Sequence, residues 1–153
     1  MDELLAPGLT VVPAGETWFR YNVRVQPHDT DYSGHVWHGA SLRWLEAARV
    51  ECLRSVGMDF ADLVRLGIDL PVVSLETRYH QPLRLGDRAM VLTRLIPPER
   101  LRLHWEYRVL VEDRLCLSAW VTLVTVDRPQ GKVFRAFPVD LAVAIAKLNA
   151  SFG

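Results

Sequence analysis

Cysteine, net charge and long apolar runs are all scarce in this sequence. Its 153 residues include two cysteines, and 18 basic residues balance 18 acidic ones. Cys52 and Cys116 form neither a CxxC pair nor a metal-ligand spacing, so we expect two reduced, buried thiols. The balanced charge gives no overall field to attract nucleic acid or an anionic membrane. No apolar run approaches the roughly 20 residues that cross a bilayer.

The first residues lack the make-up of a targeting segment. The start, MDELL, carries two acids and no basic residue, unlike a signal or transit peptide. We therefore expect a soluble cytoplasmic protein. Prolines and glycines at positions 7, 8, 13 and 15 predict a flexible lead over residues 1–16. The length fits one domain after that lead, which we place at residues 17–149.

Alternating apolar and polar residues predict several strands and one long helix. Strands are expected near 19–25, 73–79, 89–95, 101–111 and 115–123. Shorter helices are expected at 60–66 and 139–148, and a turn at 127–132. Residues 40–56 have a helical period, and their apolar face contains Leu42, Leu45, Ala48, Cys52, Leu53 and Val56.

This order of elements indicates an α+β domain. Long strands joined by short loops are expected to be neighbours in an antiparallel meander. The apolar face of the sheet needs a cover, and the long helix needs to be wrapped, so a sheet that curls around the helix satisfies both. A helix-on-sheet sandwich of another topology is the alternative. Arg49 interrupts the apolar face of the helix, so we expect it to have an acidic partner.

The segment from His28 to His38 holds two aspartates and three histidines in eleven positions. It lies between a strand and the start of the long helix, where free backbone N–H groups and the helix dipole could stabilise an oxyanion. A nearby carboxylate could activate water or attack directly. Asp29 and Thr30 are typical turn and capping residues. Asp31 is the candidate for the chemistry.

The run from Asp29 to Gly57 resembles the signature of 4-hydroxybenzoyl-CoA thioesterase-like enzymes of the hotdog fold. A D-x-D-x-x-G segment precedes a helix with an E-x-x-R pattern, here Glu46 to Arg49. The resemblance continues through a P-x-x-x-GD turn that ends at Asp87, and it covers about Tyr21 to Asp127. It implies a single hotdog domain that hydrolyses an acyl- or aryl-CoA thioester. It also implies no cofactor, since coenzyme A is part of the substrate.

The same resemblance implies roles for single residues. Asp31 matches the catalytic carboxylate, and His38 matches an active-site histidine whose backbone N–H polarises the thioester carbonyl. Where many relatives have a tyrosine, four residues before the catalytic aspartate, this chain has Pro27. The resemblance also implies a homodimer or homotetramer with its sites at a subunit interface. The exposed edges of long strands favour such partners too.

Further candidates surround this centre. Gly34 would permit the close backbone approach that the thioester needs. Trp37 either stacks on the substrate or fills the core or an interface. Arg84 and Arg88 either contact the phosphates of coenzyme A or lie on the solvated surface. We assign Glu46 and Arg49 to an ion pair that supports the helix, and take the substrate-binding candidates as Gly34, Trp37, Arg84 and Arg88.

Several interpretations stay open. The loop could serve a metal-dependent hydrolase, or the protein could bind acyl-CoA without catalysis. A hotdog dehydratase is disfavoured, because its signature histidine would lie on the central helix. The acyl group, the choice between coenzyme A and acyl carrier protein, and the general-base or nucleophilic role of Asp31 are not determined. The metal interpretation would use His28, Asp29, Asp31, His35 and His38.

Overall fold

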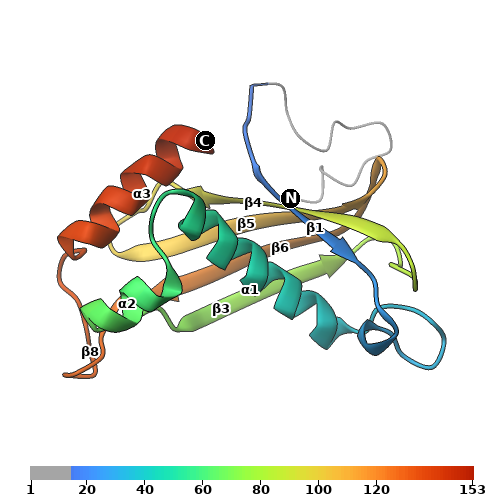
Figure 1. Cartoon of the computed structure of the whole chain (residues 1–153), viewed down its shortest axis with the longest axis horizontal. Helices are drawn as coiled ribbons and strands as arrows, with labels where there is room; N and C mark the ends of the chain where they lie inside the picture. The colour runs from blue at the N-terminus through green and yellow to red at the C-terminus, as the bar shows by residue number, and fades with distance from the viewer. Residues whose placement is uncertain (1–14) are drawn as a thin grey trace.

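The structure is a computed structural model that describes residues 15–153. Five long strands form one antiparallel sheet, in the spatial order β1-β4-β5-β6-β3. A long helix, α1, lies across one face of this sheet (Figure 1). The five strands are β1 (Phe19–Arg24), β3 (Val72–Tyr79), β4 (Arg88–Ile96), β5 (Arg102–Val111) and β6 (Arg114–Val124).

Helices and short strands complete the domain. The central helix α1 spans His38–Ser55, and α3 spans Val139–Ser151 at the left of Figure 1. The short helix α2 (Phe60–Leu66) begins at a capping box and ends at Gly67, which has a left-handed φ of 71°. A second, three-stranded sheet has the order β2-β7-β8, and a 3₁₀ turn precedes α1. These elements are β2 (Ile68–Asp69), β7 (Val126–Asp127), β8 (Lys132–Val133) and η2 (Pro27–Asp29).

The core lies between α1 and the sheet. Leu45, Ala48 and Cys52 of α1 are buried and belong to the same cluster as Trp105 and Tyr107 of β5. Both cysteines are free and buried, as the sequence predicts, and burial raises the pKa of the Cys52 thiol to about 12. Among residues 15–153, no helix is long and apolar enough to span a membrane.

Most predicted elements are confirmed, with shifted ends. The predicted fold class, an antiparallel sheet wrapped on one long helix, is confirmed. The meander holds for β4, β5 and β6 only. Strand β3 pairs with β6 instead of its neighbour in sequence, because the segment 80–87 carries the chain across to β4. The predicted lead, residues 1–16, lies outside the described residues except for its last two.

Two side chains of α1 differ from prediction. Leu42 is 36% exposed, although the helical period places it on the apolar face. Arg49 forms no recorded ion pair with Glu46. Instead, its Nη1 donates a hydrogen bond of 2.9 Å to the hydroxyl of Tyr107. The helical period shows which face of α1 is apolar, but not how wide the sheet beneath that face is. Leu42 therefore lies beyond the part of α1 that the sheet covers.

Leu45 and Leu42 allow a matched test of this packing. Leu45 is 2% exposed, so Leu45→Ala should lower the free energy of unfolding by about 2–5 kcal/mol. Leu42→Ala should cost much less, because little buried contact is lost. Urea denaturation followed by circular dichroism measures both. Equal losses of unfolding free energy in the two variants would contradict the exposure of Leu42 in the single chain.

Candidate functional site

The polar loop between η2 and α1 is closed by a β-bridge of its own and is hydrogen-bonded to segment 80–87. Thr30 and Val36 form a β-bridge, and His35 bridges to Arg84. Backbone hydrogen bonds also join Val36 N to Leu83 O at 2.8 Å and Leu85 N to Gly34 O at 3.0 Å. The loop is therefore fixed on two sides, at the end of the molecule where β3 finishes (Figure 1).

Asp29 has the structural role that the sequence predicts. Its side chain is buried, and Oδ2 accepts a hydrogen bond of 2.8 Å from the backbone N–H of Gln26, which closes the 3₁₀ turn. Oδ1 lies 3.4 Å from Nη2 of Arg43 on α1. Thr30 also caps this turn, since its hydroxyl donates to Pro27 O at 2.7 Å. Both residues serve the loop's shape.

Asp31 is exposed, and three hydrogen bonds converge on one of its oxygens. Oδ1 accepts from the Ser33 hydroxyl at 2.6 Å, the Ser33 backbone N–H at 2.9 Å and the His35 backbone N–H at 3.2 Å. The Ser33 hydroxyl contributes most to holding the pKa of Asp31 below its ordinary value. No hydrogen bond is recorded for Oδ2 among the described residues. The carboxylate is thus ionised, oriented and open on one side.

Gly34 makes this loop possible. Its φ of 81° lies in the left-handed region, and its N–H donates to Asp31 O at 3.0 Å. The backbone N–H of Asp31 in turn donates to His35 O at 2.8 Å. A side chain at position 34 would strain the turn that carries the carboxylate.

The N-terminus of α1 carries no side-chain cap. Trp37 occupies the N-cap position without a capping hydrogen bond, and no acidic residue lies in the first turn. Among the described residues, the backbone N–H groups of His38 and Gly39 have no recorded acceptor. The ring of His38 is exposed and contacts the Trp37 ring edge-on at 5.5 Å between centroids. This helix end offers free donors beside a positive dipole.

Sequence reasoning missed two residues of this region. Gly39 allows the Trp37 indole to lie over the first turn of α1, because a Cβ at position 39 would overlap that ring. Ser33 orients Asp31, and the D-x-S spacing of an Asx-type turn is the signal that could have identified it. Neither residue was among the candidates for the site.

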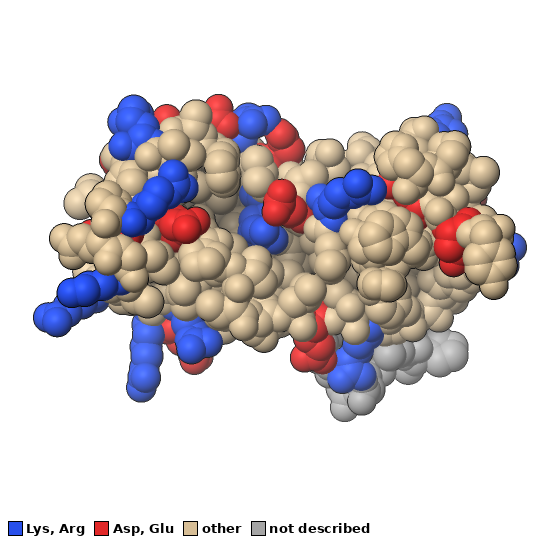
Figure 2. Space-filling model, turned by 90° about the horizontal axis from the view of Figure 1, so that it is seen from below, with Lys and Arg blue, Asp and Glu red and all other residues tan. Residues whose placement is uncertain are grey.

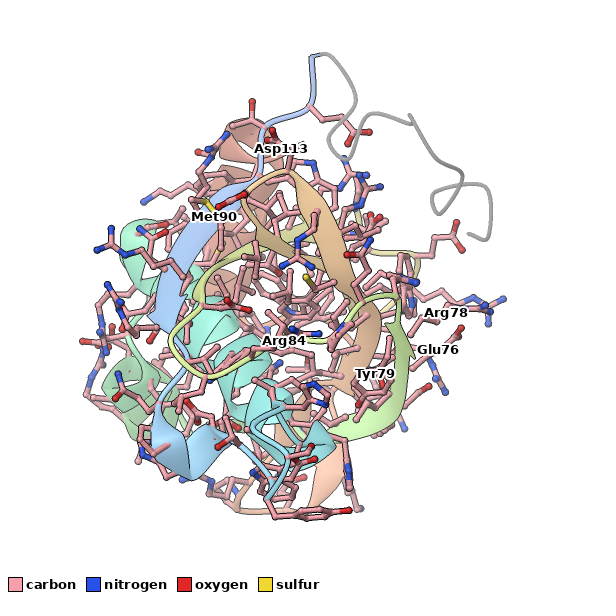
Figure 3. The ribbon with its side chains drawn as sticks, turned by 90° about the vertical axis from the view of Figure 1, so that its right-hand side faces the viewer. Glu76, Arg78, Tyr79, Arg84, Met90 and Asp113 are labelled. Carbon is pink, nitrogen blue, oxygen red and sulfur yellow. The ribbon has the colours of Figure 1, made fainter. Side chains whose placement is uncertain are left out.

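The two arginine candidates occupy different places. Arg84 lies in the loop that pairs with His35, and Figure 3 shows it at the same end of the molecule as Tyr79. Arg88 begins β4 and faces Arg24 across the strand pair. Both side chains are exposed, and neither has a recorded ion pair within residues 15–153. Arg88 and Arg24 line a shallow cavity of about 530 Å³.

The polar loop does not assemble a metal site in the described part of the chain. Asp29 is turned inward to Gln26 and Arg43, while Asp31 is held by Ser33. No cluster of three or more histidine, cysteine, aspartate or glutamate side chains with suitable geometry occurs within residues 15–153. His28 Nε2 lies 3.6 Å from Asp29 Oδ1, but the five residues of the metal interpretation do not converge on one point within this range.

Comparisons with known proteins give a consistent result. Residues 25–145 match the family model of the thioesterase-like superfamily. The chain is 50% identical over 136 residues to the "Putative esterase sll0410" of Synechocystis sp., covering 88% of this chain and 82% of that protein. It is 31% identical over 126 residues to the acyl-CoA thioester hydrolase YbgC of Escherichia coli O6:H1, covering 82% and 93%. A hypothetical protein of Aquifex aeolicus, AQ1494, has a solved structure with a TM-score of 0.78 and 28% identity, covering 83% and 98%.

Ser33→Ala tests the electrostatics of the loop. Loss of the hydroxyl donor should raise the pKa of Asp31, so that the carboxyl titrates at a higher pH than in the unaltered protein. Carbon-detected NMR titration of the labelled carboxyl measures this shift. Ser55→Ala is the control, because its hydroxyl bonds to Cys52 O at the far end of α1. An unchanged Asp31 titration in Ser33→Ala would refute the assigned cause.

Proposed function

Because the chain belongs to the thioesterase-like superfamily, we propose that it hydrolyses an acyl- or aryl-CoA thioester with Asp31 as the catalytic carboxylate. One observation carries the proposal: an ionised, oriented carboxylate lies in the loop that leads directly into an uncapped helix N-terminus. The two parts supply what the reaction needs, a base or nucleophile and a set of donors for the oxyanion.

The hydrolysis follows from these groups. The thioester carbonyl oxygen accepts hydrogen bonds from the free N–H groups of His38 and Gly39. Oδ2 of Asp31 either removes a proton from the attacking water or attacks the carbonyl carbon to form an anhydride that water then cleaves. In both routes the C–S bond breaks, and the thiolate of coenzyme A leaves and takes up a proton. We assign the exposed His38 ring to orienting water or the thioester end of the pantetheine.

Other candidates fit the rest of the substrate. We assign Trp37 and Gly34 to the reacting end, because the Trp37 ring lies against Gly39 at the start of α1 and Gly34 turns the loop that carries Asp31. Arg84 and Arg88 suit the phosphates of coenzyme A. Like charges directly opposite each other on neighbouring strands are destabilising, and Arg88 faces Arg24 in this way. A bound phosphate at this pair would relieve that repulsion.

Asp31→Asn is the direct test of the chemistry. The substitution keeps the size of the side chain but removes its charge and its basic lone pair, so turnover should fall by about 10²–10⁴-fold. Binding of a non-hydrolysable CoA thioether should change little. Thiol release from acyl-CoA esters measures turnover, and His38→Ala should be intermediate because the backbone donor survives.

Asp29→Asn is the matched control. Asp29 is buried and serves the 3₁₀ turn, so this variant should lose stability while keeping most of its turnover. A folded Asp31→Asn protein with near-normal hydrolysis, or an Asp29→Asn protein that is folded yet inactive, would overturn the assignment.

We further propose that the active form is at least a homodimer joined at β3. This strand is an edge of the sheet, and its open N–H and C=O groups can pair with another strand. Leu75 and Tyr79 pair with Val121 and Leu117, which point into the core, yet they are 45% and 58% exposed. Helix α1 packs mainly on β4 and β1, so it does not cover them.

In this proposal the open backbone groups of β3 pair with the β3 strand of a second copy of the chain, related by a two-fold axis. A two-fold axis through β3 pairs the strand antiparallel with its copy, so the Val72 end of one lies beside the Tyr79 end of the other. Tyr79 lines a cavity of about 330 Å³ together with His35 and Ser41. The catalytic loop of one protomer is thereby placed near the beginning of β3 in its partner.

Leu75→Lys tests the interface. Two lysines brought together near the two-fold axis would repel, so sedimentation velocity should show a monomer and thioesterase activity should be lost. Val143→Lys on α3 is the control, since Val143 is 49% exposed and its helix packs on β4 and α1. A wild-type protein that is fully active as a monomer would refute this dimer.

A further inference from the structure

An apolar cavity of about 430 Å³ lies between the second half of α1, α2, α3 and the sheet. Protein interiors leave few voids larger than water, and this volume falls in the range of small-molecule sites. The face shown in Figure 2 is hollowed near its middle, and side chains of both charges gather at the hollow. Most of the lining is leucine, isoleucine, valine and aromatic; its polar members are Glu46, Arg49, Asp69 and Arg128.

Arg49 brings a positive charge into this apolar wall. Its Nη1 donates to the Tyr107 hydroxyl at 2.9 Å, and Tyr107 is fully buried. Burial raises the pKa of Tyr107, so its hydroxyl is neutral at physiological pH and does not neutralise Arg49, while Glu46 and Asp69 line the same cavity. Within residues 15–153 no carboxylate forms a recorded ion pair with Arg49. A half-buried guanidinium is costly unless an anion pairs with it.

We propose that Arg49 binds an acceptor oxygen, above all a carboxylate, at the far end of an acyl group that occupies this cavity. The guanidinium has five N–H donors in a planar fork, and one of them anchors it to Tyr107. The remaining donors suit a carboxylate, and the apolar walls suit the carbon chain or ring before it. The substrate class is therefore an acyl thioester with a terminal oxygen group, and this assignment rests on the proposed thioesterase function.

In the proposed two-fold dimer at β3, the partner protomer brings an acyl group of this kind into the cavity. His38 and Arg49 are eleven residues apart on α1, which corresponds to roughly 16 Å along the helix. A short acyl group held at its own protomer's Asp31 does not reach that far. Val72, the first residue of β3, lines the cavity, and the antiparallel pairing brings the partner's catalytic loop to that end of the strand. Tyr107 acts as a positioning residue, because it fixes Arg49 without touching the substrate.

Three CoA thioesters of six carbons test the assignment: hexanoyl-CoA, 6-hydroxyhexanoyl-CoA and adipoyl-CoA. The unaltered protein should have the highest kcat/KM for adipoyl-CoA, at least about tenfold above hexanoyl-CoA, as a charge-assisted hydrogen bond implies. Arg49→Met should abolish this ratio, mainly through KM for adipoyl-CoA, while hexanoyl-CoA hydrolysis is kept. Arg49→Lys should restore part of the ratio, and Tyr107→Phe should reduce it.

Arg128→Met is the matched control, because Arg128 lines the same cavity and is exposed. It should leave the ratio of adipoyl-CoA to hexanoyl-CoA unchanged. A ratio that depends on Arg128 and not on Arg49 would overturn the proposal, as would a preference of the unaltered protein for hexanoyl-CoA. Equal loss on all three esters in both Arg49 variants would mean that Arg49 only fastens α1 to the sheet.

A binding measurement separates this proposal from the proposed hydrolysis. Hexanoate should shift the amide NMR signals of the cavity lining, and 1-hexanol should bind at least about tenfold more weakly. Arg49→Met should remove the difference between the two probes. This result in a protein that hydrolyses no thioester would leave anion recognition in place and refute the thioesterase function. Equal binding of both probes to the unaltered protein would refute the role of Arg49.

Discussion

The constraint behind most of this molecule is that a five-stranded sheet is wider than the one helix that covers it. Helix α1 packs on the β1 and β4 side and leaves the inner face of β3 open. Leu75 and Tyr79 therefore point toward the core side and still contact solvent. An edge strand with an uncovered apolar face cannot be satisfied by more turns of the same helix. In the proposed dimer a second copy of β3 pairs with the open N–H and C=O groups of this edge, and the rest of the partner lies beside Leu75 and Tyr79.

The proposed chemistry depends on the same constraint. Asp31 obtains its orientation from very short-range contacts, since all its recorded partners lie within four residues. However, it is exposed in the single chain, where water weakens every electrostatic interaction. A partner chain that covers the cavity lined by His35, Ser41 and Tyr79 would exclude water from the loop and strengthen the attraction between an oxyanion and the donors of α1. In this proposal the loop geometry orients Asp31, and the subunit contact excludes water from the same site.

The sequence predicts the elements of the fold well, because alternation and helical period report burial directly. It predicts less well which strands lie next to each other in the sheet. The place of β3 beside β6 depends on where segment 80–87 leads the chain, and periodicity carries no information about that. Arg49 is similar: its place on an apolar face demands a partner, but the choice between Glu46 and Tyr107 depends on how the sheet lies under the helix. Asp29 and Thr30 were predictable because turns are local.

Helix α1 connects the two halves of the proposed function. In the proposal its N-terminus binds the thioester carbonyl of one substrate, and Arg49, three turns further along, lines the cavity that takes the acyl group of the substrate held by the partner's loop. Under this proposal, changes at Arg49 or in the cavity walls would alter which acyl group fits and leave the Asp31 loop intact, because within residues 15–153 no recorded hydrogen bond or ion pair joins the two regions. One loop geometry could therefore serve different acyl groups. The residues proposed for the reaction and for the substrate lie in different parts of α1 and meet only across the proposed dimer.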